Sequence, residues 1–286
     1  MRNAMLRVQV RGSLSFPRVF FRNVRTQQNG TFDAPGVASG SYVLIGQMEE
    51  LLARQAVDVG DHDVDDVLVV LRPPFEISGT VRLEGNPPAA EQRGQMRVNL
   101  NAIENGGGAG SVVNADGSFT LKVTPAVYQI NPSCDAGAYL KSMHFGDQDV
   151  SGGKIDLTQQ TGGALNIVCA TDVGQIQGSV QNENGEPAAA VMITIAPDDE
   201  HQGRLDLHYQ LMSDQNGKFD YHDMAPGDYK VFAWESVDYE MMQLPEFRKA
   251  FESRAASVTI PPGGNASVQV KVIPAADMEA EKNKLP

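Results

Sequence analysis

The residue type best suited to catalysis is histidine, and the chain carries five, namely His62, His144, His201, His208 and His222. A catalytic zinc site takes histidines and a carboxylate at short, regular spacing and leaves one coordination position open for water. No histidine here is followed by glutamate three residues later, and the pattern His-Glu-x-x-His does not occur. The Gly-x-Ser-x-Gly nucleophile turn and the phosphate-binding P-loop do not occur either. The sequence therefore predicts no catalytic residue, no cofactor and no enzyme activity.

Aspartates gather in the stretch "DVGDHDVDD", where carboxylates stand at alternate positions. Asp61, Asp63 and Asp65 could converge on a hard cation such as calcium, which prefers oxygen ligands. An EF-hand loop that starts at Asp61 would need glycine and glutamate where this chain has Asp66 and Arg72. The run also aligns with plain links elsewhere in the chain, "TQQTGG" and "PPGGNA". Two interpretations stay open here, a weak calcium site and a solvated link between strands.

The two cysteines, Cys134 and Cys169, are too few for a disulfide scaffold. In an exported protein they can form one disulfide, provided that their Cα atoms lie within about 7 Å of each other. Cys169 ends a predicted strand and Cys134 follows another, and the order of strands in a sheet does not follow from this sequence. The pairing therefore stays open at this point.

A short motif occurs three times, as "QQNGTFDAPGVASGSYVLIG", "NADGSFTLKVTPAVYQI" and "DQNGKFDYHDMAPGDYKVFAW". Each copy has an Asn-Gly or Asp-Gly pair, then phenylalanine, then a turn segment and then tyrosine. The motif residues are Gly30, Phe32, Tyr42, Gly117, Phe119, Tyr128, Gly217, Phe219 and Tyr229. Asn-Gly and Asp-Gly pairs adopt the positive φ of tight hairpin turns, and the segments that follow carry β-forming residues. Each copy therefore predicts a turn, a strand, a second turn and a second strand.

The repeat extends on both sides of this motif. Upstream, "EISGTVRLEGNPPAA" matches "QIQGSVQNENGEPAA", and downstream each copy ends in an alternating strand such as "VLVVLRP". Regular turn signals and alternating strands predict all-β units of the immunoglobulin-like kind, each a two-sheet antiparallel sandwich. We expect unit one at residues 1–73, unit two at 74–172 and unit three at 173–275. A charged tail at 276–286 is expected to fray.

Unit one is shorter than the other two. It carries "LRVQVRG" and "FPRVFFRNVRT" before its turn, but no counterpart of "ISGTV". We therefore expect unit one to lack its first strand, which leaves unpaired backbone groups at a sheet edge. Either the chain is a piece of a longer protein or another segment fills the gap. Strand donation to unit one is a form of partner binding that follows from the second case.

Two outward-facing aromatic residues of unit three have two possible roles, a ligand platform or a surface covered by a helix. Because side chains alternate along a strand, Tyr229 points to one face of "DYKVFAW" while Phe232 and Trp234 point to the other. The tyrosine face is the core face, so the two outward aromatics are a candidate ligand platform that can stack on a sugar ring. Alternatively, "LPEFRKAFESRA" forms a short helix near 245–253 whose two phenylalanines cover them. We favour the helix.

Composition excludes several classes of function. The 286 residues carry a formal net charge of −13 and are 41% hydrophobic, enough to bury cores. Such a charge argues against binding to nucleic acid or to an anionic membrane surface. No apolar run approaches the roughly 20 residues that cross a bilayer, and "MRNAMLRVQVRGS" lacks the apolar core of a signal peptide. We expect no nucleic-acid partner and no transmembrane segment.

The repeated motifs resemble a known family. "ISGTVRLEGNPP", "IQGSVQNENGEPAAAVMITIAPD" and "DQNGKFDYHDMAPGDYKVFAWE" are similar to carboxypeptidase regulatory-like domains. These are transthyretin-like β-sandwich modules of secreted bacterial proteins, related to Cna protein B-type repeats. The resemblance covers nearly the whole chain and implies a noncatalytic spacer, adhesion or interaction module. It also implies an extracellular, periplasmic or cell-envelope location and a protein or glycan partner there that stays unknown.

Two further functions follow from the same resemblance. One is a carbohydrate-binding module, because the fold is shared with starch-binding-like modules, although aromatics make up only 7% of the chain. The other is an accessory region of a zinc carboxypeptidase. Cna B-type modules often carry a Lys–Asn crosslink between their first and last strands. "ISGTVRLEG" and "IQGSVQNENG" contain no lysine, so we expect no such crosslink here.

Overall fold

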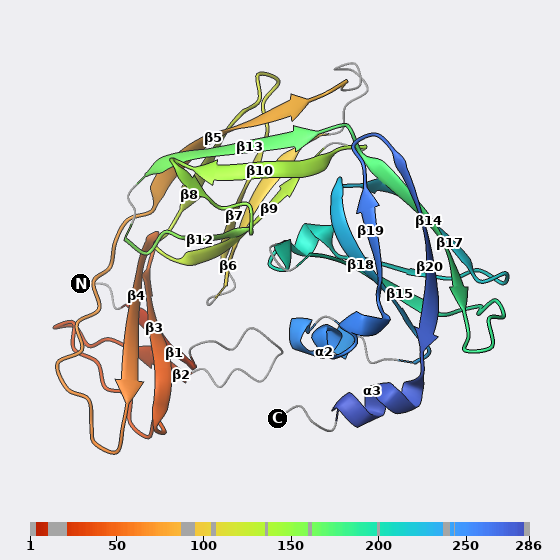
Figure 1. Ribbon diagram of the computed structural model, residues 1–286. Helices are drawn as coiled ribbons and strands as arrows, with labels where there is room; N and C mark the ends of the chain where they lie inside the picture. Colours follow the sequence, from red (N-terminus) through yellow and green to blue (C-terminus); the bar gives the residue numbers. More distant parts are fainter. Residues whose placement is uncertain are drawn as a thin grey trace.

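The chain is an all-β array of β-sandwich modules. The computed structural model describes residues 4–10, 22–86, 95–103, 107–134, 137–159, 162–198, 201–236, 241–242 and 244–282. Its sheets follow one another along the chain, from the red strands near the N-terminus to the blue strands near the C-terminus (Figure 1). Helices α2 and α3 lie near the C-terminal end of the array (Figure 1).

Unit one forms a four-stranded antiparallel sheet in the order β2–β1–β3–β4. Its strands are β1 (Met5–Val10), β2 (Arg22–Arg25), β3 (Gly40–Met48) and β4 (Leu51–Val59). Residues 11–21, which include most of "FPRVFFRNVRT", lie outside the described part of the chain. Pairing places Leu6, Val8 and Leu44 on one face, where all three are buried. Over the described residues this sheet has no second sheet packed on it, and the incompleteness of unit one stays a prediction.

Unit two is a sandwich of two sheets, β11–β10–β13–β5–β8 and β12–β9–β6–β7. Its strands are β5 (Phe75–Glu84), β6 (Arg97–Ala102), β7 (Gly108–Val112), β8 (Ser118–Val123), β9 (Val127–Ser133), β10 (Tyr139–Phe145), β11 (Gln148–Asp149), β12 (Lys154–Asp156) and β13 (Gly163–Ala170). Alternation sends every second side chain inward, so Ile77, Leu100, Ile130 and Leu165 form a buried core between the sheets.

Unit three repeats this plan. One group of strands is β17–β14–β20 and the other is β16–β15–β18–β19, and the two groups join where β18 pairs with β20. The strands are β14 (Gly174–Gln181), β15 (Met192–Pro197), β16 (Tyr209–Met212), β17 (Lys218–Met224), β18 (Gly227–Trp234), β19 (Ala256–Ile260) and β20 (Asn265–Ile273), and η3 spans Leu205–Leu207. Ile176, Ile193 and Val231 are fully buried between the two groups.

The first strand of each complete unit lies in the middle of its sheet. β5 pairs with β13 on one side and β8 on the other, and β14 pairs with β20 and β17 in the same way. The first and last strands of a unit run parallel, and the remaining described pairs are antiparallel apart from the short β18–β20 contact. The predicted antiparallel sandwich therefore holds for most pairs. The parallel pairs arise because the last strand of each complete unit lies beside the first strand and runs in the same direction.

The three copies of the repeated motif fold into the same turn. The φ of the turn glycine is +88° at Gly30, +86° at Gly117 and +68° at Gly217, which is the predicted positive region. In each copy the glycine N–H donates to the carbonyl three residues earlier, at 2.9–3.0 Å. Each motif tyrosine donates its hydroxyl to the carbonyl four residues earlier, Tyr42 to Ala38, Tyr128 to Thr124 and Tyr229 to Ala225. The motif therefore has the same backbone role in all three units.

Helices cover the outer face of unit three. The helix expected near 245–253 is present as α2 (Pro245–Ala250), which begins at a proline and continues into η4 (Glu252–Arg254). The prediction that the C-terminal tail frays is corrected, because the first part of the tail forms α3 (Ala275–Lys282). Met278 of α3 is buried, and Asp277 Oδ2 lies 2.6 Å from Arg254 Nη1. One apolar side chain and one ion pair thus dock a segment whose composition predicts fraying.

Candidate functional site

The candidate ligand platform at Phe232 and Trp234 is covered. The two rings stack with centroids 5.3 Å apart, and Phe247 and Phe251 from the α2 segment lie 5.9 and 5.5 Å from the Trp234 ring. The exposed fractions of Phe232 and Trp234 are 3% and 0%, and Trp234 Nε1 donates to Thr194 Oγ1 at 3.0 Å. The platform interpretation is therefore wrong. The apolar side of α2 removes this aromatic surface from water, as the alternative interpretation expects.

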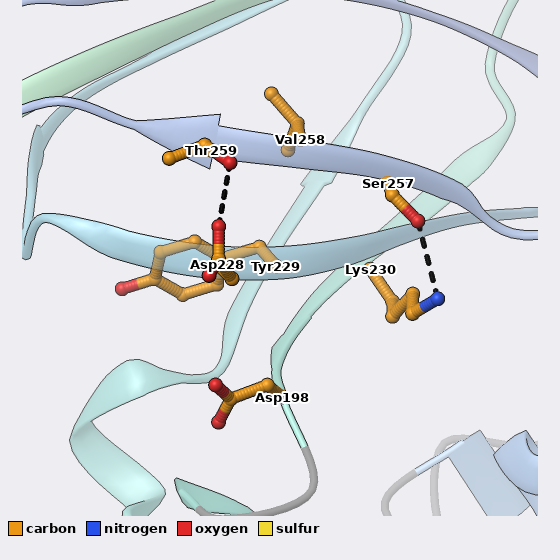
Figure 2. Close-up of a pocket in the computed structure, with 7 residues that line it drawn as sticks. All are labelled: Asp198, Asp228, Tyr229, Lys230, Ser257, Val258 and Thr259. Carbon is orange, nitrogen blue, oxygen red and sulfur yellow. Dashed lines mark hydrogen bonds between the residues drawn. The ribbon is translucent and has the colours of Figure 1, made fainter.

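A polar groove continues the same face of the sheet (Figure 2). Its volume is about 290 Å³, and it is lined by Asp198, Asp228, Tyr229, Lys230, Ser257, Val258 and Thr259. Pairing of β18 with β19 sets Asp228 beside Thr259 and Lys230 beside Ser257. Strand alternation places these four side chains on the face that carries Phe232 further along β18. One face of β18 is thus polar at its start and apolar at its end.

The polar side chains of the groove mainly bind one another. Thr259 Oγ1 donates to Asp228 Oδ1 at 2.5 Å, and Lys230 Nζ donates to Ser257 Oγ at 3.1 Å (Figure 2). Lys230 Nζ also lies 3.6 Å from Glu252 Oε1 of η4. Such cross-strand pairs hold β19 against β18. The groove can hydrogen-bond a small polar molecule, and its first role is to connect the two strands. Sequence reasoning missed it, although matching alternation in "GDYK" and "ASVT" was a usable signal.

The calcium candidate at Asp61, Asp63 and Asp65 is also corrected. The segment from Gly60 to Asp66 forms no strand or helix and is exposed. His62 Nε2 lies 3.5 Å from Asp61 Oδ1, and both side chains are about nine-tenths exposed. In the described part of the chain, no three His, Cys, Asp or Glu side chains are grouped to hold a metal ion. The three aspartates therefore do not converge, and the segment is a solvated link.

A second cavity, with a volume of about 840 Å³, lies in unit one. The sheet order β2–β1–β3–β4 matches the order β16–β15–β18–β19 in unit three and β7–β6–β9–β12 in unit two. The floor of the cavity is the core face of this sheet, with Val8, Tyr42, Leu44 and Val57. Residues 30–37 and 60–67 form its other walls. The cavity thus lies where the second sheet packs in the complete units.

The motif phenylalanine shows what unit one lacks. The ring of Phe119 lies directly against Gly79 of β5, and the ring of Phe219 lies against Gly178 of β14, so that a Cβ on either glycine would collide with the ring. Phe119 and Phe219 are buried, with exposed fractions of 2% and 5%. Phe32 has no described first strand to pack on, is only half-buried and lines the cavity.

The segment "VLVVLR" at residues 67–72 has the composition of a last strand, and the sequence predicts one there. In the structure it forms no strand and makes only an isolated bridge between Arg72 and Leu52. Leu68 and Val70 of this segment are 74% and 54% exposed. The expectation fails because the last strand of a unit pairs with the first, as β20 does with β14.

The two cysteines form a disulfide between Cys134 and Cys169, whose Cα atoms lie 5.9 Å apart. Cys134 follows β9 in one sheet of unit two, and Cys169 is the second-last residue of β13 in the other. The bond therefore connects the two sheets across the core. The sequence left this pairing open because it did not order the strands.

Comparison with known proteins finds solved structures that are similar to this chain only at low identity and low TM-score. No protein-family model matches the chain, and no curated protein matches it. A streptococcal ancillary pilin is similar at 10% identity and a TM-score of 0.33, over 95% of this chain and 92% of that one. The minor pilin GBS52 of Streptococcus agalactiae is similar at 12% identity and a TM-score of 0.33, over 69% and 94%. The major pilin subunit BcpA of Bacillus cereus is similar at 10% identity and a TM-score of 0.26, over 94% and 93%.

Similarity at this level does not transfer the function of those pilins to this chain. A helix long and apolar enough to span a bilayer is not found among the described residues.

Proposed function

We propose that this chain is a noncatalytic, exported β-sandwich repeat protein that acts as a spacer and interaction element at the cell envelope. The observation that supports the proposal is the junction between units two and three, where buried contacts fix two complete sandwiches against each other. The repeated motif supports carboxypeptidase regulatory-like modules as the finer assignment. The carbohydrate-binding alternative loses its platform because Trp234 is buried. No contact among the described residues favours the zinc carboxypeptidase alternative.

Arg204 joins unit two to unit three. Its side chain is 7% exposed and belongs to unit three, yet Nη2 donates to the carbonyl of Leu140 in β10 at 2.7 Å. The same guanidinium binds both carboxylate oxygens of Asp206, at 2.8 and 2.6 Å. A two-point ion pair of this kind has a defined geometry. Separating the units would exchange this buried hydrogen bond of a charged donor for hydrogen bonds to water, at a net cost of about 1.5–3 kcal/mol.

Tyr139 strengthens the same junction. It belongs to β10 of unit two, but its ring packs against the core of unit three. Burial, together with the nearby carboxylate of Asp172, raises the pKa of Tyr139 to about 12, so the phenol stays neutral. β13 ends at Ala170 and β14 begins at Gly174, so the linker between the units is short. These features together favour a fixed distance and angle between units two and three.

The junction between units one and two is exposed by comparison. Lys122 Nζ of unit two lies 3.0 Å from Glu50 Oε2 of unit one, with side chains 58% and 77% exposed. Exposed ion pairs stabilise by only about 0–1 kcal/mol. The ion pair at this junction is therefore exposed, whereas the contacts of Arg204 and Tyr139 at the other junction are buried or partly buried.

Small-angle X-ray scattering of the full chain tests the spacer role. We expect the wild-type curve to fit one fixed arrangement of units two and three. Arg204→Ala should increase the radius of gyration, because it removes the buried contact, whereas Lys122→Ala at the exposed junction serves as the matched control. A wild-type curve that requires units two and three to move freely would overturn the proposal.

The disulfide between Cys134 and Cys169 supports export, because disulfides persist in oxidising compartments. Thiol trapping in the producing cells tests this part. Alkylation before and after reduction should show both cysteines oxidised in cells. Two reduced cysteines in cells at steady state would contradict an exported protein.

A further inference from the structure

A strand position that no described residue of unit one fills suggests a specific partner. We propose that unit one accepts an extended strand from a separate polypeptide, and that this strand carries Lys or Arg followed by the pattern apolar-x-Gly-x-apolar. In strand addition, backbone hydrogen bonds give affinity and pockets for alternate side chains give specificity. The strand site does not depend on the rigid junction between units two and three, so the two proposals succeed or fail separately.

The complete units show which strand unit one needs. β14 lies between β17 and β20, and β5 lies between β8 and β13. In the repeat, residues 31–36 correspond to β8 and β17, and residues 67–72 correspond to β13 and β20. Neither segment forms a strand in unit one. The strand that would pair with both is the first strand, and none of the described residues supplies it.

The shape of the site sets the central pattern of the partner strand. Ile176 and Val180 of β14 point into the core and are fully buried, and Gly178 between them makes room for the Phe219 ring. β5 repeats this arrangement with Ile77, Gly79 and Val81. Phe32 stands at the matching place in unit one and lines the cavity. The partner strand therefore needs glycine opposite Phe32 and apolar side chains two positions before and after it.

The outward positions of the last-strand segment differ between the units. In unit three they are polar, with Ser267 and Gln269 beside Gln177 and Ser179 of β14. In unit one the exposed side chains of residues 67–72 include Leu68 and Val70, which are apolar and 74% and 54% exposed. A partner that covers these two side chains would remove apolar surface from water, which favours binding. A strand that pairs with this segment would place its own outward side chains beside them.

The acidic link sets the charge at one end of the partner strand. In unit three the link between β19 and β20 touches the start of β14, because Gly263 N–H donates to Asp172 O at 2.8 Å and Gln175 N–H donates to Gly264 O at 2.9 Å. The matching link in unit one, residues 60–66, carries Asp61, Asp63, Asp65 and Asp66, all at the rim of the cavity. The N-terminal end of the partner strand would thus meet negative charge, which Lys or Arg complements.

Fluorescence anisotropy with labelled peptides and the full chain tests this site. The first probe is Lys-Lys-Gln-Ile-Gln-Gly-Ser-Val-Gln, which copies residues 175–181 of this chain behind two lysines. The second has valine in place of glycine, and the third has serines in place of the lysines. We expect the first peptide to bind at least about tenfold more tightly than either of the others. Added salt should weaken the first peptide more than the lysine-free one.

Two variants and a matched control locate the binding. Leu68→Asp combined with Val70→Asp should weaken the first peptide at least about tenfold, and the fold should persist because both side chains are already exposed. Leu205→Asp changes a similarly exposed residue of unit three and should leave binding unchanged. Hydrogen exchange should slow at residues 67–72 when the first peptide is bound.

Three results would overturn the proposal. One is the absence of binding, and another is equal binding of the glycine and valine peptides, which would show nonspecific association of strands. The third is a dimer of the chain alone, with residues 67–72 already protected from exchange and released by dilution. That result would make a second copy the occupant in place of a separate polypeptide.

Discussion

Units one and three contain the same motif but close their cores differently. In both units the turn glycine has positive φ and the motif tyrosine hydroxyl binds the carbonyl four residues earlier. Yet Tyr229 is 3% exposed, whereas Tyr42 is only half-buried and lines a cavity. The turns form from local sequence in either case. Closure of the core requires the first strand, which lies in the middle of the second sheet and holds its neighbours in place.

Helices cover the outer face of the sheet in unit three, whereas the described residues of unit one form no helix. In unit three Phe232 and Trp234 are enclosed by the α2 segment, and Met278 of α3 joins the same cluster. Unit three therefore buries both faces of the sheet that contains β18, and its stability should exceed that of unit one. Hydrogen exchange read by mass spectrometry can follow the opening free energy of each unit in the full chain.

The largest expected difference comes from the enclosed tryptophan. Trp234→Ala should lower the opening free energy of unit three by about 3–5 kcal/mol, because it leaves a large cavity among packed rings. Phe32→Ala in unit one should cost about 1 kcal/mol, since a half-buried ring loses less apolar contact. In the wild type, Trp234 fluorescence should be blue-shifted and poorly quenched by acrylamide. Ready quenching by acrylamide would show that α2 does not cover this face in solution.

The turn glycines should respond unequally to the same substitution. Gly30→Ala should cost about 1 kcal/mol, from positive φ alone, because nothing lies within 4 Å of the added Cβ. At Gly217 the Cβ would lie 2.8 Å from Val180 O and 2.9 Å from Ala188 N, which adds about 1–3 kcal/mol. Exchange rates in units one and three of the two variants give the comparison. Equal losses of opening free energy in the two variants would mean that the close contact with Val180 O adds no steric cost at Gly217.

The motif tyrosines offer a smaller and cleaner comparison. Burial raises the pKa of Tyr229, so its hydroxyl remains a donor to Ala225 O at 2.8 Å. Tyr229→Phe should destabilise unit three by about 1–1.5 kcal/mol, because it leaves a buried carbonyl without this donor. Tyr42→Phe should cost less than about 0.5 kcal/mol, since water can reach Ala38 O. A larger loss at Tyr42 would show that unit one is closed in solution, as a bound strand would make it.

The smallest expected effect is the pH dependence of the opening free energy of unit three. Burial lowers the pKa of His208 below its usual 6.5, so the folded state favours the neutral ring more than the unfolded state does. Its contribution is therefore fully present above pH 6.5 and is lost as the pH falls below that value toward the folded pKa. Unit three should lose opening free energy across this range, and His208→Gln should flatten the dependence. An unchanged slope in the variant would assign the effect to other groups.

Much of the fold could be predicted from local patterns. The Asn-Gly and Asp-Gly pairs, the alternation of "SFTLKV" and the proline before "EFRKAF" each act through nearby backbone conformation, and the structure shows the expected turn, strand and helix. The strand predicted at "VLVVLR" failed because a strand also needs a partner. α3 was missed because the burial of Met278 depends on contacts with distant residues, which composition does not reveal.

The sequence by itself determined the three turns and the tyrosine contacts, because each depends on residues close together in the chain. Tertiary structure alone decided that the first strand is central, that Cys134 meets Cys169, and that Arg204 ties two units together. It also decided that Trp234 is covered while Leu68 is exposed. These outcomes depend on strand order and on which surfaces meet. Pairing and burial join residues far apart in the chain, so no local pattern specifies them.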